Sequence, residues 1–376
     1  MNSPIKTLMA DGRELIYFTD DKKTPVTPAE DKRTSEPRPE TNQLRKDPLT
    51  GDWISVSPHR GARAFLPPKE SCPLCPSTDD YLSEIPGDFD VAVFENKNPS
   101  FGPETEPISP AGNPLVETAS ATGRCEVVVF SPEHSGSLAG QTRERFRTVV
   151  DAWIHRTKDL LAIDGVQQVF IFENRGEEIG VTLHHPHGQI YSYPFITPTT
   201  KKLQRQIDSL GDDFFEKLLD SESNTERVLI ETDYFLSFVP FAARWPIEIQ
   251  ILPKRHIQNL TEMTDDETEE FAEIYQKLLG TLDRIYDTPT PYIAAIDQAP
   301  KGDSRIRMMV KITSPRRAPN KLKYLAGSES AMGAFITDTT PEAIAEMLKE
   351  VLDVLRKSLE KNLKANQKLS GKHRAE

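Results

Sequence analysis

Apolar residues recur at intervals of three and four in three long segments of the chain, which is the period of one face of an α-helix. The segments span residues 141–161, 265–286 and 341–359. The second opens with "TDDE", in which Thr264 and Glu267 have the spacing of a capping box. The third follows "TTPE", where Thr340 suits the N-cap and Pro341 the first helical position. The pattern therefore predicts three helices.

Short runs rich in β-branched and aromatic residues, bounded by Pro, Gly or Asn, are typical of strands. They are residues 126–130, 166–174, 188–195, 246–253 and 291–297. The order of elements repeats, because a strand, a helix, a strand and "HHPHGQIY" form one series, and "IEIQILP", a helix, "PYIAAID" and "RMMVKITSP" form another. A duplicated strand–helix–strand–strand unit predicts an α+β fold, with an antiparallel sheet and packed helices in each copy.

Composition divides the chain further. Residues 20–46 are charged, proline-rich and nearly free of large apolar residues, which is typical of a mobile segment. We expect a mobile N-terminal arm over residues 1–46, a first half over 47–200, a second half over 201–360 and a basic tail over 361–376.

The charge and the cysteine count limit the class of protein. The 376 residues include 46 basic and 58 acidic side chains, so the net charge of −12 disfavours general binding to nucleic acid or anionic lipid. Apolar runs stay far below the roughly 20 residues of a membrane span, and the N-terminus lacks the apolar core of a secretory signal. The three cysteines do not resemble a secreted disulfide framework. We expect a cytoplasmic enzyme with neither a membrane nor a nucleic acid as partner.

The stretch "SCPLCP" can present two thiolates, from Cys72 and Cys75, to one tetrahedral metal ion. His134 and His185 are the candidates for the remaining two ligands in the first repeat. A site closed by four protein ligands is structural, because no position stays open for water. A redox pair or two buried thiols are the alternatives.

Histidine is scarce, with eight in the chain, yet "HHPHGQ" holds three of them. On a strand, His185, His187 and Gln189 point to the same face. A neutral imidazole can attack phosphorus, and a neighbouring carboxamide N–H can stabilise phosphate oxygens. The spacing suits one histidine as metal ligand and one as nucleophile, whereas two core histidines in a strand are the alternative.

Several loops carry groups suited to phosphate or sugar. Arg60 and Arg63 stand three apart beside a glycine, as in a phosphate clamp. Lys323 precedes Glu329, a carboxylate that suits sugar hydroxyls. The stretches "VFENKN" and "FENRG" each end a strand with Asn. Each loop taken alone is equally typical of a solvated surface.

Together, "DPLTGDWISVSPHRGAR", "CPLC", "FSPEH", "FENRGEEIG" and "HPHGQIY" resemble, in this order, the galactose-1-phosphate uridylyltransferase family of the histidine-triad superfamily. The resemblance covers residues 44–360 and implies two histidine-triad-like halves. It implies that His187 is the uridylylated nucleophile and Gln189 its phosphate-orienting partner. The implied zinc ligands are Cys72, Cys75, His134 and His185. The implied substrate-binding residues are Arg60, Arg63, Asn96, Asn174, Lys323 and Glu329, with the last two contributed across a homodimer.

The chain also departs from this family. Well-known members have Cys-Ser where this chain has Val181 and Thr182, although the Thr182 hydroxyl still suits a phosphate. Members also hold a second metal through a Glu and three His. The corresponding region here contains Asp297, Met309, Lys311 and Leu203. Methionine and lysine do not rebuild such a site, so we expect one structural Zn²⁺ and no second metal.

The resemblance implies a ping-pong exchange of UMP between UDP-glucose and galactose 1-phosphate. Two alternatives stay open at this point. One is a phosphorylase or hydrolase of a nucleotide sugar or dinucleoside polyphosphate, and the other is a protein that binds a uridine nucleotide without turnover.

Overall fold

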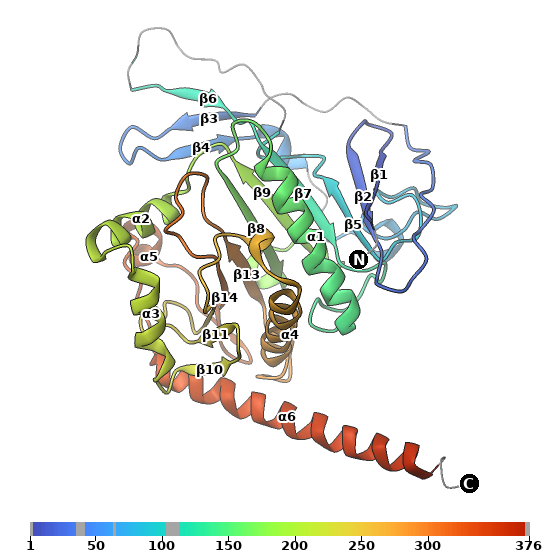
Figure 1. The fold of residues 1–376 in the computed structure, drawn as a ribbon. Helices are drawn as coiled ribbons and strands as arrows, with labels where there is room; N and C mark the ends of the chain where they lie inside the picture. The colour runs from blue at the N-terminus through green and yellow to red at the C-terminus, as the bar shows by residue number, and fades with distance from the viewer. Residues whose placement is uncertain (1–2, 35–41, 63–64, 103–112, 114, 373–376) are drawn as a thin grey trace.

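The computed structural model describes residues 3–34, 42–62, 65–102, 113 and 115–372, with side chains described as far as residue 357. Within this part of the chain, the main sheet has 11 strands in the order β1-β2-β5-β7-β9-β8-β13-β14-β12-β11-β10, and every paired neighbour is antiparallel. Figure 1 shows this sheet running through the body of the molecule.

The first half supplies β1 (Ile5–Leu8), β2 (Glu14–Phe18), β5 (Val91–Glu95), β7 (Arg124–Val129), β8 (Gln168–Arg175) and β9 (His187–Tyr193). The second half supplies β10 (Val228–Glu231), β11 (Phe235–Phe238), β12 (Ile247–Pro253), β13 (Tyr292–Asp297) and β14 (Met309–Ser314). A small sheet holds β3 (Gln43–Lys46), β4 (Trp53–Val56) and β6 (Thr118–Ser120), and a hairpin holds β15 (Arg316–Ala318) and β16 (Lys321–Leu322).

The α-helices are α1 (Arg143–Leu161), α2 (Pro198–Leu210), α3 (Phe214–Ser223), α4 (Asp265–Leu282), α5 (Gly327–Met332) and α6 (Pro341–Lys372). Short 3₁₀ turns are η1 (Pro58–Ala62), η2 (Lys69–Ser71), η3 (Glu177–Ile179) and η4 (Leu260–Glu262). The capping box of α4 is confirmed, since Thr264 and Glu267 satisfy each other's backbone N–H groups. The predicted helix over residues 341–359 is present as α6 and continues to Lys372.

The predicted duplication and the α+β fold are confirmed by the strand registers. In the first half, β9 lies between β7 and β8, and Gln189 pairs with Val127 and Phe172. In the second half, β14 lies between β12 and β13, and Lys311 pairs with Gln250 and Ala295. The two units form one sheet, because β8 and β13 pair directly. Neither strand is therefore left as an unpaired sheet edge.

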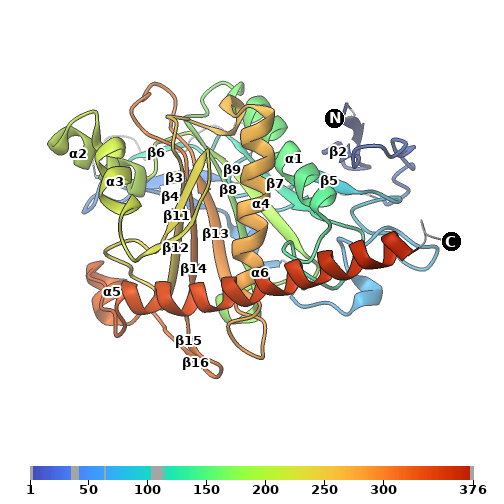
Figure 2. The same ribbon diagram turned by 60° about the horizontal axis from the view of Figure 1, so that its bottom comes forward.

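Helices α1 and α4 cover one face of the sheet and form its main core (Figure 2). From α1, Phe146, Val149, Val150 and Trp153 are buried on the predicted apolar face, whereas Ile154 and Leu161 are only partly buried and Leu160 is buried instead. They pack with the α4 residues Phe271, Tyr275 and Leu278 over the strand residues Ile171, Ile190, Ala294, Ile296 and Val310.

The opposite face, which we call the site face, has a cover at each end. At one end, Cys72, Leu74 and Ile85 pack on the β2, β5 and β7 residues Leu15, Tyr17, Phe94 and Val127. At the other end, Ile207 of α2 and Phe215 of α3 pack on Leu252 and Met309. Between the covers the face is only partly buried, and Ile293 of β13 is 36% exposed.

Secondary structure extends into the segments expected as an arm and a tail, and one expected boundary lies within a helix. The arm expected over residues 1–46 includes β1, β2 and β3, and residues 15–18 of β2 are buried because the strand lies between β1 and β5 with both faces covered. The boundary expected after residue 200 falls within the first turn of α2. The tail expected over 361–376 begins inside α6, and residues 373–376 lie outside the described part.

Candidate functional site

The two cysteines and two histidines predicted as metal ligands come together in space. Their ligand atoms all lie within 4.8 Å of one another, although they come from the turn after η2, the loop after β7 and the residues before β9. The Cys75 Sγ lies 3.4 Å from Nδ1 of both His134 and His185, and the Cys72 Sγ lies 3.8 Å from Nδ1 of His185. Ligands of a tetrahedral zinc at about 2.0–2.3 Å would be spaced by about 3.3–3.8 Å, so the donor set fits zinc.

The chemical state of His185 also suits a metal ligand. Its Nε2–H donates to the Ser131 carbonyl at 2.8 Å, which leaves the Nδ1 lone pair directed at the two cysteines. Burial lowers the pKa of His185 to about 4, so its imidazole is neutral at physiological pH. Neutral imidazole is the form that binds a metal ion.

His187 is the first residue of β9 and lies on the site face. Its Nδ1–H donates to the His185 carbonyl at 2.7 Å, which fixes the ring and leaves the lone pair on Nε2. Burial lowers the pKa of His187, so the neutral ring is favoured. On β8, Asn174 follows Phe172, the partner of Gln189, by two residues and lies near His187. Both residues line a cavity of about 220 Å³.

Gln189 and Tyr191 follow His187 along the same face, at intervals of two residues on β9. We call His187, Gln189 and Tyr191 the row on β9, and one of the two predicted arginines contacts it. The Arg60 Nη2 donates to the Tyr191 hydroxyl at 3.4 Å, and its Nη1 donates to the Asn98 carbonyl at 2.8 Å. Arg63 lies outside the described residues.

The two predicted asparagines stand at different places along this row. Asn174 lies on β8, pairs with Ile293 of β13 and lines the His187 cavity. Asn96 follows β5, where its N–H donates to the Cys125 carbonyl at 2.8 Å and its side-chain oxygen accepts the Asn98 N–H at 2.9 Å. Since Cys125 pairs with Tyr191, Asn96 belongs to the Arg60 end of the row.

The loop between β8 and β9 carries Thr182. Its carbonyl accepts the Leu66 N–H at 2.8 Å, and its neighbours Val181 and Leu183 line the His187 cavity. The loop starts at Gly176, where φ is +103° and an added Cβ would lie 2.7 Å from the Pro291 side chain. Only glycine suits that position.

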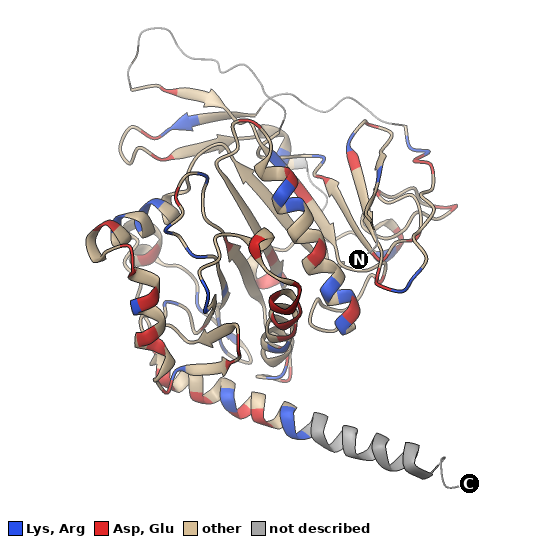
Figure 3. Cartoon of the chain, in the orientation of Figure 1, with Lys and Arg blue, Asp and Glu red and all other residues tan. Residues whose placement is uncertain are grey.

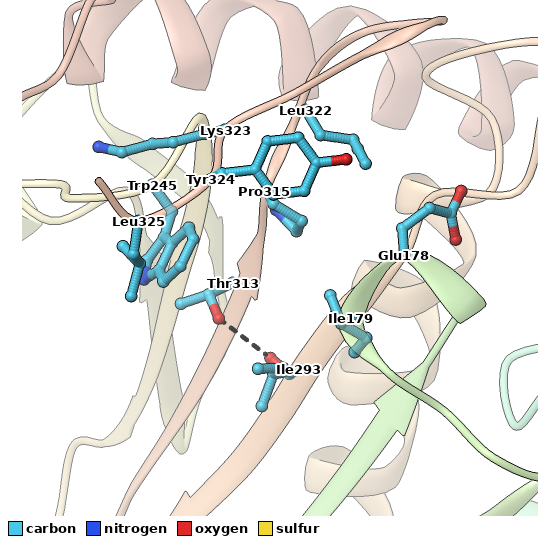
Figure 4. Close-up of a pocket in the computed structure, with 10 residues that line it drawn as sticks. All are labelled: Glu178, Ile179, Trp245, Ile293, Thr313, Pro315, Leu322, Lys323, Tyr324 and Leu325. Carbon is cyan, nitrogen blue, oxygen red and sulfur yellow. Dashed lines mark hydrogen bonds between the residues drawn. The ribbon is translucent and has the colours of Figure 1, made fainter. Parts of the chain in front are cut away.

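Lys323 and Glu329 lie together in the second half, 3.7 Å apart. Lys323 lines a separate cavity of about 210 Å³ with Trp245, Ile293 and Thr313. Figure 4 shows its amino group turned away from this cavity, and Nζ donates to the carbonyls of Arg244, at 2.8 Å, and Ile336. Among the described residues, none lines both this cavity and the His187 cavity, although Ile293 of the first pairs with Asn174 of the second.

In the region expected to lack a second metal, Met309 and Leu203 make apolar contacts and Lys311 and Asp297 form an ion pair. Met309 is buried in the cluster that Leu203 joins from α2. Lys311 and Asp297 form an ion pair of 2.6 Å. A thioether and a lysine-paired carboxylate are poor donors for a hard metal ion, so the absence of a second metal stays a prediction with a clear chemical reason.

An aromatic row on the site face was not predicted. Phe170 and Phe172 stack at 5.3 Å, Phe172 meets Tyr191 at 5.1 Å, and Phe101 meets Tyr193 at 5.0 Å. The alternation in "VFIFEN" and "GQIYSY" could have indicated it, because it places these rings on the face of Gln189. Such a surface suits the stacking of a nucleobase.

Comparison with known proteins gives a consistent family. Residues 32–197 match the family described as galactose-1-phosphate uridyl transferase, N-terminal domain, and residues 200–358 match its C-terminal domain. A galactose-1-phosphate uridylyltransferase of Streptomyces lividans is 39% identical over 364 residues, covering 93% of this chain and 98% of the relative. One of Thermotoga maritima is 35% identical over 319 residues, covering 82% of this chain and 98% of the relative.

Solved structures agree with the sequence relatives. A uridylyltransferase structure superposes with a TM-score of 0.74 at 32% identity, covering 83% of this chain and 99% of that one. An ADP-glucose phosphorylase of Arabidopsis thaliana with bound ADP-glucose has a TM-score of 0.61 at 23% identity, covering 82% of this chain and 98% of that one. The second likeness concerns the fold alone.

Proposed function

Since the chain belongs to the galactose-1-phosphate uridyl transferase family, we propose that it exchanges a uridylyl group between UDP-glucose and galactose 1-phosphate through a covalent intermediate on His187. The observation that carries this proposal is the hydrogen bond that the His187 Nδ1–H donates to the His185 carbonyl. It prepares Nε2 as the nucleophile, next to Gln189 and beside a closed cluster of metal ligands.

In the first step, the Nε2 lone pair forms a bond to the α-phosphorus of UDP-glucose. The bond from that phosphorus to the bridging oxygen breaks, and glucose 1-phosphate leaves. The imidazole becomes cationic when it is uridylylated, and the His185 carbonyl stabilises the Nδ1–H that carries this charge. In the second step, a phosphate oxygen of galactose 1-phosphate attacks, the P–N bond breaks, and UDP-galactose and neutral His187 result.

Neighbouring groups suit the charge that develops at phosphorus. The Gln189 carboxamide projects from the same face of β9 and offers N–H donors to the non-bridging oxygens. Asn174 lines the same cavity as His187, and Arg60 supplies a cation at the Tyr191 end of the row. The Thr182 hydroxyl is a further phosphate donor in this proposal. The rings of Phe172 and Tyr191 would take the uracil base.

Cys72, Cys75, His134 and His185 would hold zinc, which supplies rigidity rather than reactivity because no coordination position stays open. His185 therefore has two functions, since its ring is a ligand and its carbonyl orients His187. This arrangement explains why ligand and nucleophile stand two residues apart.

The sugar phosphate requires a second copy of the chain in this proposal. Lys323 lines a different cavity from His187 and pairs with Glu329, and both would contribute to the site of the partner in a homodimer, as the family resemblance implies. We also propose a cytoplasmic location and no nucleic-acid partner, in keeping with the net charge of −12 and the mixture of acidic and basic residues along α1 in Figure 3. No helix in the described part of the chain is sufficiently long and apolar to span a membrane.

Incubation with UDP-glucose labelled in the uracil ring, without an acceptor, tests the proposal. The protein is denatured in alkali, because a P–N bond is acid-labile, and digested to locate the label. We expect label on His187 in the wild type and none in His187→Ala. The matched control is His256→Ala, which removes an imidazole of the second half that lies 2.8 Å from the Ser304 carbonyl.

Subsequent addition of galactose 1-phosphate should release the label as UDP-galactose. Steady release of UMP from the wild type without acceptor would indicate a hydrolase, and release as a nucleoside diphosphate by inorganic phosphate would indicate a phosphorylase. Tight binding without labelling would indicate a binding protein. Each of these three results would refute the transferase.

A further inference from the structure

The N-terminal hairpin of β1 and β2 lies before the residues matched to the family, which begin at residue 32, yet it adjoins the metal ligands. Strand β2 pairs with β5, and its Leu15 and Tyr17 belong to the same apolar cluster as Cys72 and Leu74. Apolar contact thus joins the hairpin to the turn that presents both cysteines.

A buried arginine follows the turn of this hairpin. The side chain of Arg13 is 0% exposed. Its Nη1 donates to the Glu95 carbonyl at 2.8 Å, its Nε donates to Asp11 at 2.7 Å, and its Nη2 donates to the carboxylate of Glu84. With acceptors on all three nitrogens, the direction of the guanidinium toward Glu84 is fixed.

Glu84 also binds a second arginine from the N-terminal region. The Arg33 Nη1 lies 2.9 Å from the carboxylate oxygen of Glu84 that Arg13 does not take. Arg33 is held in turn by Asp31 at 2.8 Å, and Asp31 accepts the Ala10 N–H at 2.9 Å. Both carboxylate oxygens of Glu84 are therefore bound by arginines that precede residue 35.

The segment around Glu84 fastens the cysteine turn. The Glu84 N–H donates to the carbonyl of Pro73, which stands between the two cysteines, at 3.0 Å. The hydroxyl of Ser83 donates to the Cys75 carbonyl at 2.5 Å. A displacement of Glu84 would move both carbonyls, and with them the two thiolates.

We propose that Arg13, Arg33 and Glu84 form a clamp that positions the cysteine turn and retains the metal ion. The inference rests on the metal centre proposed above, and it does not depend on the identity of the nucleotide sugar. Groups that hold a ligand in place from outside the coordination sphere strongly influence metal affinity. Loss of one guanidinium would leave a largely buried carboxylate with half of its compensation, which favours a shift of the turn.

The clamp also affects the orientation of the nucleophile, because His185 connects the cysteine turn to His187. Its ring lies 3.4 Å from the Cys75 thiol, and its carbonyl accepts the Nδ1–H of His187. A loosened cysteine turn would therefore disturb the orientation of His187 as well as the retention of the metal.

Zinc release from the full chain tests this proposal. The zinc-loaded wild type, Arg13→Gln, Glu84→Gln and the double variant are mixed with a coloured chelator, well below the unfolding temperature of each. Arg33→Gln is a milder variant, since this side chain is 17% exposed. The matched control is Arg227→Gln, which breaks a buried ion pair with Glu222 in the second half of the chain.

We expect Arg13→Gln to release zinc about tenfold faster than the wild type, Arg33→Gln to release it at an intermediate rate, and Arg227→Gln to match the wild type. The double variant should release zinc more slowly than the product of the two single effects predicts, because both changes remove the contact between Arg13 and Glu84. With Co²⁺ in place of zinc, the visible bands of the tetrahedral ion should change in Arg13→Gln and stay unchanged in Arg227→Gln.

Other results would overturn the clamp. Equal acceleration in Arg13→Gln and Arg227→Gln would mean that release follows general stability. Release at the wild-type rate in both Arg13→Gln and Arg33→Gln would refute the clamp alone. A wild type that takes up no zinc would refute the metal centre and the clamp together, whereas the labelling of His187 tests the transferase independently.

Discussion

Replacing Glu173 by glutamine should stabilise the protein at alkaline pH. This carboxyl group is 4% exposed on the face of the sheet that α1 and α4 cover, and it accepts the Tyr292 hydroxyl at 3.0 Å. Burial raises the pKa of Glu173 to about 8, although the nearby Arg175 opposes this shift. Because the folded-state pKa is raised, the folded state keeps a proton that the unfolded state loses. The resulting stability is fully present below pH 4.5 and is lost as pH rises through 8.

The magnitude follows from the two pKa values. A difference between 4.5 and about 8 corresponds to about 5 kcal/mol, at about 1.4 kcal/mol for each pKa unit. About 4 kcal/mol of this should be lost between pH 5 and pH 9. Glutamine retains an oxygen that accepts the Tyr292 hydroxyl and never ionises, so Glu173→Gln should abolish this component of the pH dependence.

Urea unfolding of both proteins from pH 5 to pH 9, followed by circular dichroism and tryptophan fluorescence, measures the effect. Other groups titrate in both proteins, so the informative quantity is the difference in the free energy of unfolding between variant and wild type. That difference should grow in favour of the variant by about 4 kcal/mol across the range. Glu346→Gln, which removes an exposed carboxylate of α6, is the control. A difference for Glu173→Gln that does not change with pH would refute the reasoning.

Gly188→Ala should lower uridylyl transfer by about tenfold or more while the zinc content stays unchanged. Gly188 stands between His187 and Gln189, and an added Cβ would lie 2.9 Å from the Phe130 ring and 3.2 Å from the Phe172 carbonyl. Wild-type rates of labelling and release would contradict this prediction. Thr264→Ala removes the capping box of α4 and should lower the free energy of unfolding in urea by about 1 kcal/mol. His134→Ala should reduce the zinc content, measured by mass spectrometry of metals, from about one per chain to near zero. The same measurement should find no iron in the wild type, and stoichiometric iron would disprove the predicted absence of a second metal.

Local patterns in the sequence were sufficient for the three longest helices, α1, α4 and α6, and for the face of each central strand. In α1 the spacing of Phe146, Val149 and Trp153 identifies the buried side. In β9 the alternation that points His187 and Gln189 one way follows from strand geometry alone. The metal cluster could also be predicted, because a turn that presents two thiolates needs two further ligands to close a tetrahedral site.

Long-range packing accounts for what the sequence did not reveal. Strand β2 does not alternate, since both of its faces are buried, so its sequence gave no strand period. Helix α2 has Leu203, Ile207 and Leu210 at helical spacing, but it is short and fully buries only Thr200 and Ile207. Lys323 stands beside a glycine-containing loop, but its sequence context could not indicate that the carbonyls of Arg244 and Ile336 hold its amino group within the single chain.

The two covers of the site face explain why only one of the two repeated units can carry the reaction. His187 and Met309 are equivalent, since each is the first residue of the central strand of its unit. Met309 lies under α2 and α3, in contact with a cluster that contains Ile207 and Phe215, so a histidine at that position would be sealed from any substrate. His187 is not covered by the cysteine turn. His185 connects the two, because its ring contacts Cys75 and its carbonyl accepts the His187 Nδ1–H. The His187 ring itself lines a cavity. The duplication supplied two similar strands, and the covers left one of them accessible.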